Sequence, residues 1–211
     1  MAGLIGRDAG AFLAHLLRLD GTAVVRLRPA GGVVQLWARL PFGVLVTREV
    51  RAGVVRDVTV RAKDLFDVVR SGGDRLPAAV DAQWRWPLPP HAGAQVEELP
   101  AAEVRRVVDA AAKVVRDAIA EGVGGRAVGT RRIRDAMLDH VPFVIDHAGE
   151  RFDVPQRQVQ GLVRMGFLGD DPVAVRRAAR WTGLAATHGS CWYLPVGETL
   201  YLQVAPYQPN G

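Results

Sequence analysis

The sequence has one cysteine and two serines, and these shortages limit the disulfide, zinc and catalytic sites that it can form. Because Cys191 has no second cysteine, we expect neither an intrachain disulfide nor a zinc site built on cysteine thiolates. Ser71 and Ser190 are the only serines, and no pair of carboxylates stands in a Gly-framed loop. We therefore assign no catalytic residue, no metal site and no cofactor, and expect a protein that is not an enzyme.

Long apolar runs are also missing, and their absence bears on location. No run of 18 apolar residues is present, so the sequence predicts no membrane-spanning helix and no membrane partner. Arg7, Asp8 and Arg18 interrupt the region that a secretory signal would keep apolar, and we therefore expect a cytoplasmic protein. With 49% hydrophobic residues among 211, the chain can bury a sizeable core, in one large domain or two smaller ones.

The positive charge is almost all arginine. A net charge of +5 is typical of nucleic-acid partners, but an Arg-, Ala- and Val-rich composition is also typical of a GC-rich genome. The positions of the charges therefore matter more than their sum. The Gly-rich stretch 121–132 follows a helical pattern and has no Gly-Lys-Ser/Thr ending, so we interpret it as a linker rather than a phosphate loop. Asp139-His140 and Asp146-His147 have no third cluster nearby, and we interpret them as polar surface residues.

Hydrophobic periodicity predicts a mixed succession of helices and strands. A helix at 9–19 is followed by period-two segments, and a short strand then runs directly into a helix that Gly72-Gly73 should end. Two tryptophans, Trp84 and Trp86, are expected in a further strand. The predicted strands are 22–28, 33–39, 44–50 and 58–60, with helices within 61–73, at 103–119 and at 130–139 and a hairpin at 143–154.

Residues 170–195 allow two structures. Asp171, Pro172 and Gly183 have the spacing of a helix start and end, whereas the alternating valines and a Thr-His-Gly-Ser turn are typical of a β-meander. An internal repeat favours the meander, because a shift of 94 residues lays 58–73 over 152–167 and the first helix over the start of the long one. A closing strand is also predicted at 198–206. The repeat aligns Val60 with Val154, Lys63 with Arg157, Leu65 with Val159, Arg70 with Arg164 and Gly72 with Gly166.

Three segments resemble bacterial sliding clamps, the ring-shaped processivity factors of DNA replication: "TVRAKDLFDVVRSGG", "DVPQRQVQGLVRMGFLGDDPVAVR" and "LPAAEVRRVVDAAAKVV". The resemblance implies an α+β fold of two similar domains, each with two helices packed on antiparallel sheet, the helices facing DNA. The domains would be 1–98 and 99–211, with a Gly-rich and helical insertion at 121–141. Because bacterial clamps carry three domains per chain, two-domain chains would have to trimerise to close a ring.

The repeat also selects candidate nucleic-acid contacts. Its basic residues recur at i and i+7 on equivalent helices, where they would contact the phosphates of double-stranded DNA without reading sequence. Two alternatives stay open: a protein–protein interaction or scaffold protein without DNA binding, and a winged helix whose recognition helix at 155–165 uses Gln156, Gln158 and Gln160. Homo-oligomerisation is the other partnership that the resemblance implies. The candidate contacts are Lys63, Arg70, Arg105, Arg116, Arg157 and Arg164.

Overall fold

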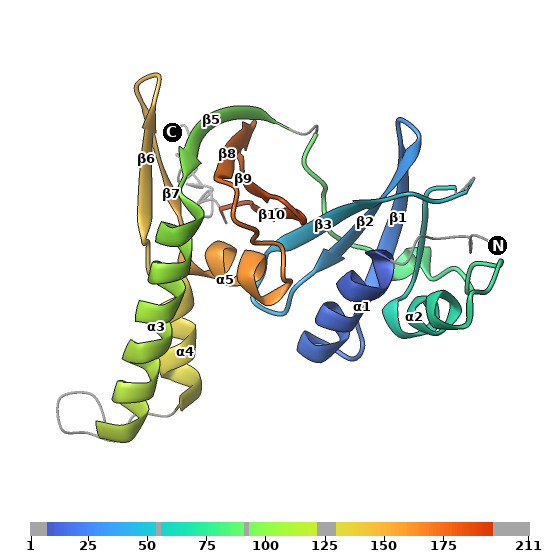
Figure 1. The fold of residues 1–211 in the computed structure, drawn as a ribbon, viewed down its shortest axis with the longest axis horizontal. Coiled ribbons are helices and arrows are strands. Elements are labelled where there is room, and N and C mark those ends of the chain that lie inside the picture. Colours follow the sequence, from blue (N-terminus) through green and yellow to red (C-terminus); the bar gives the residue numbers. More distant parts are fainter. Residues whose placement is uncertain (1–7, 54–55, 91–92, 122–129, 196–211) are drawn as a thin grey trace, which may run out of the picture.

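The computed structural model describes residues 8–53, 56–90, 93–121 and 130–195. Its centre is an eight-stranded sheet in the order β4-β1-β2-β3-β10-β9-β8-β5, in which every neighbouring pair is antiparallel (Figure 1). A separate hairpin pairs β6 with β7. The strands are β1 (Val24–Ala30), β2 (Val33–Arg39), β3 (Leu45–Val50), β4 (Val58–Arg61), β5 (Ala94–Leu99), β6 (Phe143–His147), β7 (Glu150–Val154), β8 (Val173–Ala178), β9 (Trp181–Ala186) and β10 (Gly189–Tyr193).

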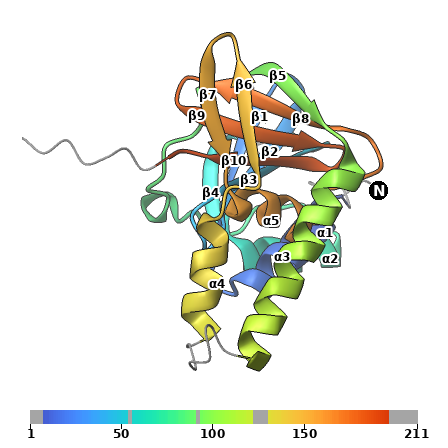
Figure 2. The same cartoon turned by 90° about the vertical axis from the view of Figure 1, so that its left-hand side faces the viewer.

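Helices cover one face of this sheet. The inner stripe of α1, formed by Phe12, Leu13 and Leu16, is fully buried, as expected for an amphipathic helix on a sheet. Figures 1 and 2 show α3 and α4 extending beyond the sheet as a helical pair, with α5 beside their base. The helices are α1 (Asp8–Leu19), α2 (Ala62–Ser71), α3 (Ala101–Glu121), α4 (Thr130–Asp139) and α5 (Gln156–Arg164), with one 3₁₀ turn, η1 (Asp81–Gln83).

The predicted α+β fold with two helices on antiparallel sheet in each half is confirmed, and the internal repeat has a structural counterpart. Strand β4 leads into α2 as β7 leads into α5, and Gly72 and Gly166 both have positive φ. Each half also contributes an edge strand and a three-stranded meander to the large sheet. These are β4 with β1, β2 and β3, and β5 with β8, β9 and β10, and β3 pairs with β10 at the centre. The two halves therefore share one continuous sheet. The division into domains at residues 98 and 99 stays a prediction, and β5, which spans this boundary, pairs with β8.

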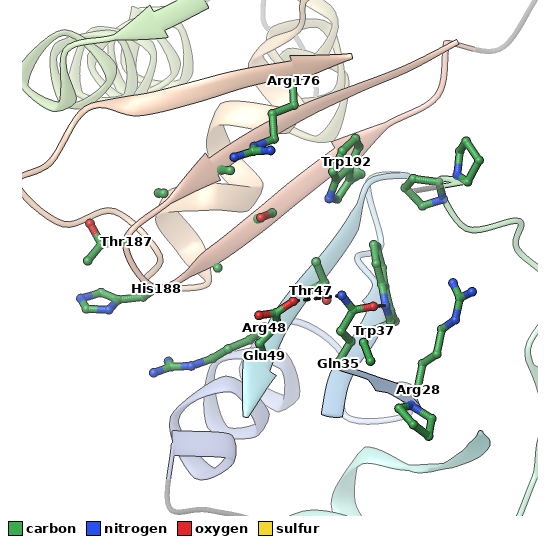
Figure 3. A pocket seen from close by; sticks show the side chains of 18 residues that line it. Arg28, Gln35, Trp37, Thr47, Arg48, Glu49, Arg176, Thr187, His188 and Trp192 are labelled. Atoms are coloured by element: carbon green, nitrogen blue, oxygen red, sulfur yellow. Dashed lines mark hydrogen bonds between the residues drawn. The ribbon is translucent and has the colours of Figure 1, made fainter. Parts of the chain in front are cut away.

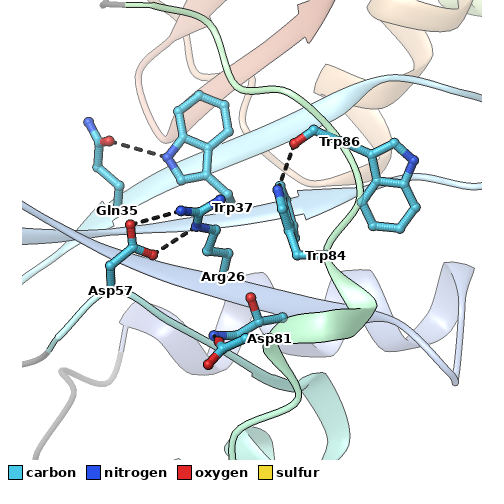
Figure 4. Close-up of polar contacts among 8 residues, drawn as sticks. Arg26, Gln35, Trp37, Asp57, Asp81, Trp84 and Trp86 are labelled. Carbon is cyan, nitrogen blue, oxygen red and sulfur yellow. Dashed lines mark hydrogen bonds and ion pairs between the residues drawn. The ribbon is translucent and has the colours of Figure 1, made fainter.

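Residues 170–195 form the predicted β-meander, as β8, β9 and β10. The predicted strand around Trp84 and Trp86 is wrong, because both follow η1 in a segment without strand pairing. The reason is local: Pro87, Pro89 and Pro90 have no N–H to donate to a ladder, and the Trp84 indole instead donates to the Trp86 carbonyl at 2.7 Å (Figure 4). The predicted closing strand at 198–206 and most of the Gly-rich linker lie outside the described residues.

Helix α5 packs tightly on the centre of the sheet. A Cβ atom added at Gly161 would lie 2.7 Å from the Cys191 Sγ atom, so only glycine permits this approach. The buried Gln158 amide donates to the carbonyls of Thr182 at 2.8 Å and Cys191 at 3.0 Å, which ties the helix to β9 and β10. The position of α5 over the junction of the two halves is therefore fixed by both shape and hydrogen bonds.

Cys191 should be unreactive in the folded protein. Its thiol is fully buried, and burial raises its pKa because the thiolate is poorly solvated there. Since the thiolate is the reactive form, we expect no alkylation by iodoacetamide near pH 8 under native conditions and complete alkylation in denaturant. Mass spectrometry of the intact protein measures both, and rapid labelling of the native protein would contradict this burial.

Candidate nucleic-acid interface

The two candidate contacts on α2 are exposed, but acidic residues accompany them. Lys63 lies 3.9 Å from Asp67, one helical turn away, and the Arg70 guanidinium lies 5.7 Å from the Phe66 ring centroid. Helix α2 carries two acidic and two basic residues, so it contributes no net charge. These two side chains can extend a basic surface but do not create one.

Arg105, at the start of α3, is engaged in a structural contact. Its guanidinium donates to the Gly169 carbonyl at 2.7 Å and to Asp170 Oδ1 at 3.1 Å. These bonds join α3 to the loop that precedes β8. The structure therefore gives Arg105 a tertiary partner of its own.

The other three candidates meet in one place. Arg116 on α3 and Arg157 and Arg164 on α5 line a groove of about 920 Å³. The groove lies between α3, α4, α5 and the turn that joins β2 to β3. Helix α5 carries two arginines and no acidic residue, whereas α1 and α2 each balance their charges. Helix α5 itself brings only positive charge to the groove, where Asp139 of α4 pairs with Arg157 and Asp135 of α4 is a second acidic lining residue.

The two arginines of α5 do different things. Arg157 is only 22% exposed in its side chain, donates to the Phe42 carbonyl at 3.1 Å and forms an ion pair with Asp139. Arg164 is exposed, donates to Gln160 at 3.1 Å, and its guanidinium lies 5.7 Å from the Phe42 ring. Arg157 thus anchors the β2–β3 turn, and that turn supports Arg164 at the rim of the groove.

The winged-helix alternative is wrong. Gln156 is 1% exposed and Gln158 is fully buried, so neither can reach a base edge in a duplex major groove. The helix instead turns these two side chains toward the protein. A three-stranded meander follows α5, but the buried face of the helix excludes it as a recognition helix.

Sequence reasoning missed three parts of the groove. The turn at 41–43 meets a helix more than 100 positions later in the chain. Arg39 and Gln156 also line the groove. Periodicity gave no signal for them, because it identifies the face of an element and not the element that packs against it.

A second cavity lies on the opposite, outer face of the sheet. It encloses about 580 Å³ between Trp37 and Trp192, with Arg28 and Arg176 contributing positive charge (Figure 3). Arg176 donates to the Gly93 carbonyl at 3.2 Å, and the buried Thr47 hydroxyl has no hydrogen-bond partner within the described ranges. Arg176 therefore lies on the face of the sheet opposite the helices.

A hydrogen-bonded network of polar side chains lies on the same outer face, at the β1 and β4 end of the sheet. Arg26 donates to both carboxylate oxygens of Asp57, at 2.7 and 2.9 Å, and Asp81 accepts from the backbone N–H of Thr59 at 2.6 Å (Figure 4). The hydrogen bond with Asp57 raises the pKa of Arg26, because it favours the charged guanidinium. Trp84 lies over this network, with its ring 6.0 Å from the guanidinium. These contacts hold η1 and the segment that follows it, which carries Trp84, against β1 and β4.

The part of the chain that the structure describes has neither a metal-binding cluster nor a membrane-spanning helix. No group of three or more His, Cys, Asp or Glu side chains there could hold a metal ion. No helix there has the length and apolar character needed to cross a membrane.

Comparison with solved structures shows which fold this is. The chain is similar to the DNA polymerase III subunit beta from Pseudomonas aeruginosa, with a TM-score of 0.58 and 13% identity over 97% of this chain and 68% of that chain. A sliding clamp structure from the same organism with a ligand has a TM-score of 0.55 and 15% identity, over 95% of this chain and 66% of that chain. For the DNA polymerase III beta subunit from Thermotoga maritima, the TM-score is 0.51 and the identity 12%, over 95% of this chain and 65% of that chain. The predicted clamp-like fold is confirmed, and the chain spans about two thirds of the length of these proteins.

Sequence comparison gives the family. No curated protein matches the chain. Residues 6–86 match the family described as "Domain of unknown function (DUF8010)". Residues 88–197, more than half of the chain, match that described as "Domain of unknown function (DUF8185)", and the chain therefore belongs to the DUF8185 family.

Proposed function

We propose that this protein is a non-catalytic, clamp-like protein that associates with double-stranded DNA through the phosphate backbone, without sequence specificity. The observation that carries the proposal is the groove in which Arg116, Arg157 and Arg164 meet, with an α5 wall free of acidic residues. The fold that the chain shares with proteins named as sliding clamps supports the same function.

The geometry suggests how the contact works. The exposed guanidinium groups of Arg116 and Arg164 present planar donors that match phosphate oxygens. Arg157 positions the turn beneath Arg164 and contributes charge from a half-buried site. Lys63 and Arg70, on α2, extend the track along the helical face. Because every phosphate presents the same oxygens, such contacts position the protein on DNA and carry no sequence information.

We also propose self-association, because a chain with about two thirds of the length of a bacterial clamp needs further copies to surround DNA. Three two-domain copies would close a ring. Light scattering at micromolar concentration gives the mass directly. A strict monomer with and without DNA would contradict the ring and leave only an open, clamp-like contact.

Binding to duplexes of unrelated sequence tests the function. We expect affinities within about twofold of one another, with the logarithm of the binding constant falling by about 0.9 per neutralised phosphate for each tenfold increase in salt. Fluorescence anisotropy between about 50 and 200 mM salt measures this slope. Absence of binding at the lowest salt would contradict the proposal and favour the scaffold alternative, to which the exposed apolar side chains Val114 and Ile119 would then point.

A further inference from the structure

The groove contains a buried side-chain amide, that of Gln156. Gln156 is the first residue of α5 and is 1% exposed. Its backbone N–H donates to the His140 carbonyl at 2.7 Å, which fixes the start of the helix. Both polar atoms of its side chain, Nε2 and Oε1, lack a hydrogen-bond partner among the residues that the structure describes. Because buried polar groups are normally paired, this amide offers one donor and one acceptor to a ligand.

The surroundings of Gln156 limit what that ligand can be. Two layers of apolar side chains line the groove, Val108 and Val115 from α3 and Met137 and Leu138 from α4. The exposed Arg116 and Arg164 also line it, and α4 adds Asp135 and Asp139. A ligand that fits must combine a flat or apolar body, an edge with a donor beside an acceptor, and negative charge outside the groove.

We propose that the groove accepts one unpaired base of a single-stranded nucleic acid, with the Gln156 amide hydrogen-bonded to the edge of the base. Nucleobases present a donor beside an acceptor on their Watson–Crick edge and have an apolar face, and their phosphates would meet Arg116 and Arg164. A base-paired duplex cannot insert a base in this way without flipping it. The inference rests on the proposed function and adds to it a second mode, in which one exposed nucleotide is held in the groove.

An oligonucleotide without bases separates this contact from phosphate binding. We compare the anisotropy of a labelled single strand of thymidines with that of an abasic strand of equal length and charge. The native protein should bind the thymidine strand about tenfold more tightly, which corresponds to about 1.4 kcal/mol. Gln156→Leu, which keeps the volume and removes the amide, should abolish this difference and leave duplex binding unchanged.

The matched control is Gln83→Leu, the same substitution at an exposed residue of η1, which should behave as the native protein. Gln156→Met serves as a second variant if the leucine variant does not fold. Equal binding of the thymidine and abasic strands by the native protein overturns the inference, and so does a base preference that survives in Gln156→Leu. If the native protein binds neither single strands nor duplex, the proposed function fails as well. Duplex binding without a base preference leaves the proposed function intact.

Discussion

Replacing Phe167 by alanine should lower the free energy of unfolding by about 3–5 kcal/mol, the usual range for a fully buried aromatic side chain. Phe167 has no exposed surface, and its ring stacks on Phe12 of α1 with centroids 6.2 Å apart. Its carbonyl accepts from the His188 backbone N–H at 3.1 Å. The ring also lies close to Gly189 of β10, where an added Cβ atom would be 2.8 Å from it. The side chain therefore joins the first helix of the N-terminal half to the sheet of the C-terminal half, and its loss leaves a cavity at their junction.

Denaturant unfolding measures this effect, with Phe66→Ala as the control. Phe66 lies on α2 and is only partly buried, so its truncation should cost clearly less. Equal losses for the two variants would show that the junction between the halves contributes nothing special to stability. A large loss only for Phe167→Ala supports one cooperative unit across the two halves.

Reversing two exposed charges should have the largest effect on DNA binding. For Arg116→Glu with Arg164→Glu, we expect duplex affinity to fall about 100-fold near 0.1 M salt, because two phosphate contacts are lost. The salt slope should become shallower by about 1.8 for the same reason. Both residues are exposed on helix surfaces, so the fold should persist.

The matched control carries Arg85→Glu and Arg180→Glu. These arginines are also exposed but lie outside the groove. Arg85 is in the segment that follows η1, and Arg180 is in the turn between β8 and β9. The net charge changes by the same amount in both double variants. If the control loses as much affinity as the groove variant, the effect is one of total charge and the proposed interface is wrong.

The strand-to-helix steps could be predicted from the sequence because each is a local event. At Val60 and Val154 the residue pattern changes from period two to helical spacing. The glycines that follow the two helices, Gly72 and Gly166, are equally visible in the sequence. The meander at 170–195 was less accessible, since its Asp-Pro start is equally compatible with a helix. Comparison with the other half of the chain resolved it.

The Trp84 segment shows where this reasoning stops. Aromatic residues favour strands on average, but here the nearby prolines cannot donate to a ladder, and both tryptophans cover the outer face of the sheet. Whether an aromatic side chain forms part of a sheet or lies across it depends on tertiary packing. The prolines are a local signal against a strand, but they do not show which surface the two tryptophans cover.

The candidate interface was predicted in part, for a similar reason. The i and i+7 spacing identified Arg157 and Arg164 as neighbours along one helix, but it could not show that Asp139 and the Phe42 carbonyl engage Arg157. These partners lie on other elements, at separations that periodicity does not report. The buried Gln156 amide was likewise visible only once α3, α4 and α5 were placed together.

The most direct test of DNA binding on the helical face is arginine modification by phenylglyoxal with and without bound duplex, followed by peptide mass spectrometry. Modification of Arg116 and Arg164 should slow about tenfold when DNA is bound, because each phosphate contact shields a guanidinium. Arg85 and Arg180 should react at the same rate in both states. Unchanged reactivity of Arg116 and Arg164 in a DNA-saturated sample, or protection confined to Arg85 and Arg180, would contradict the account.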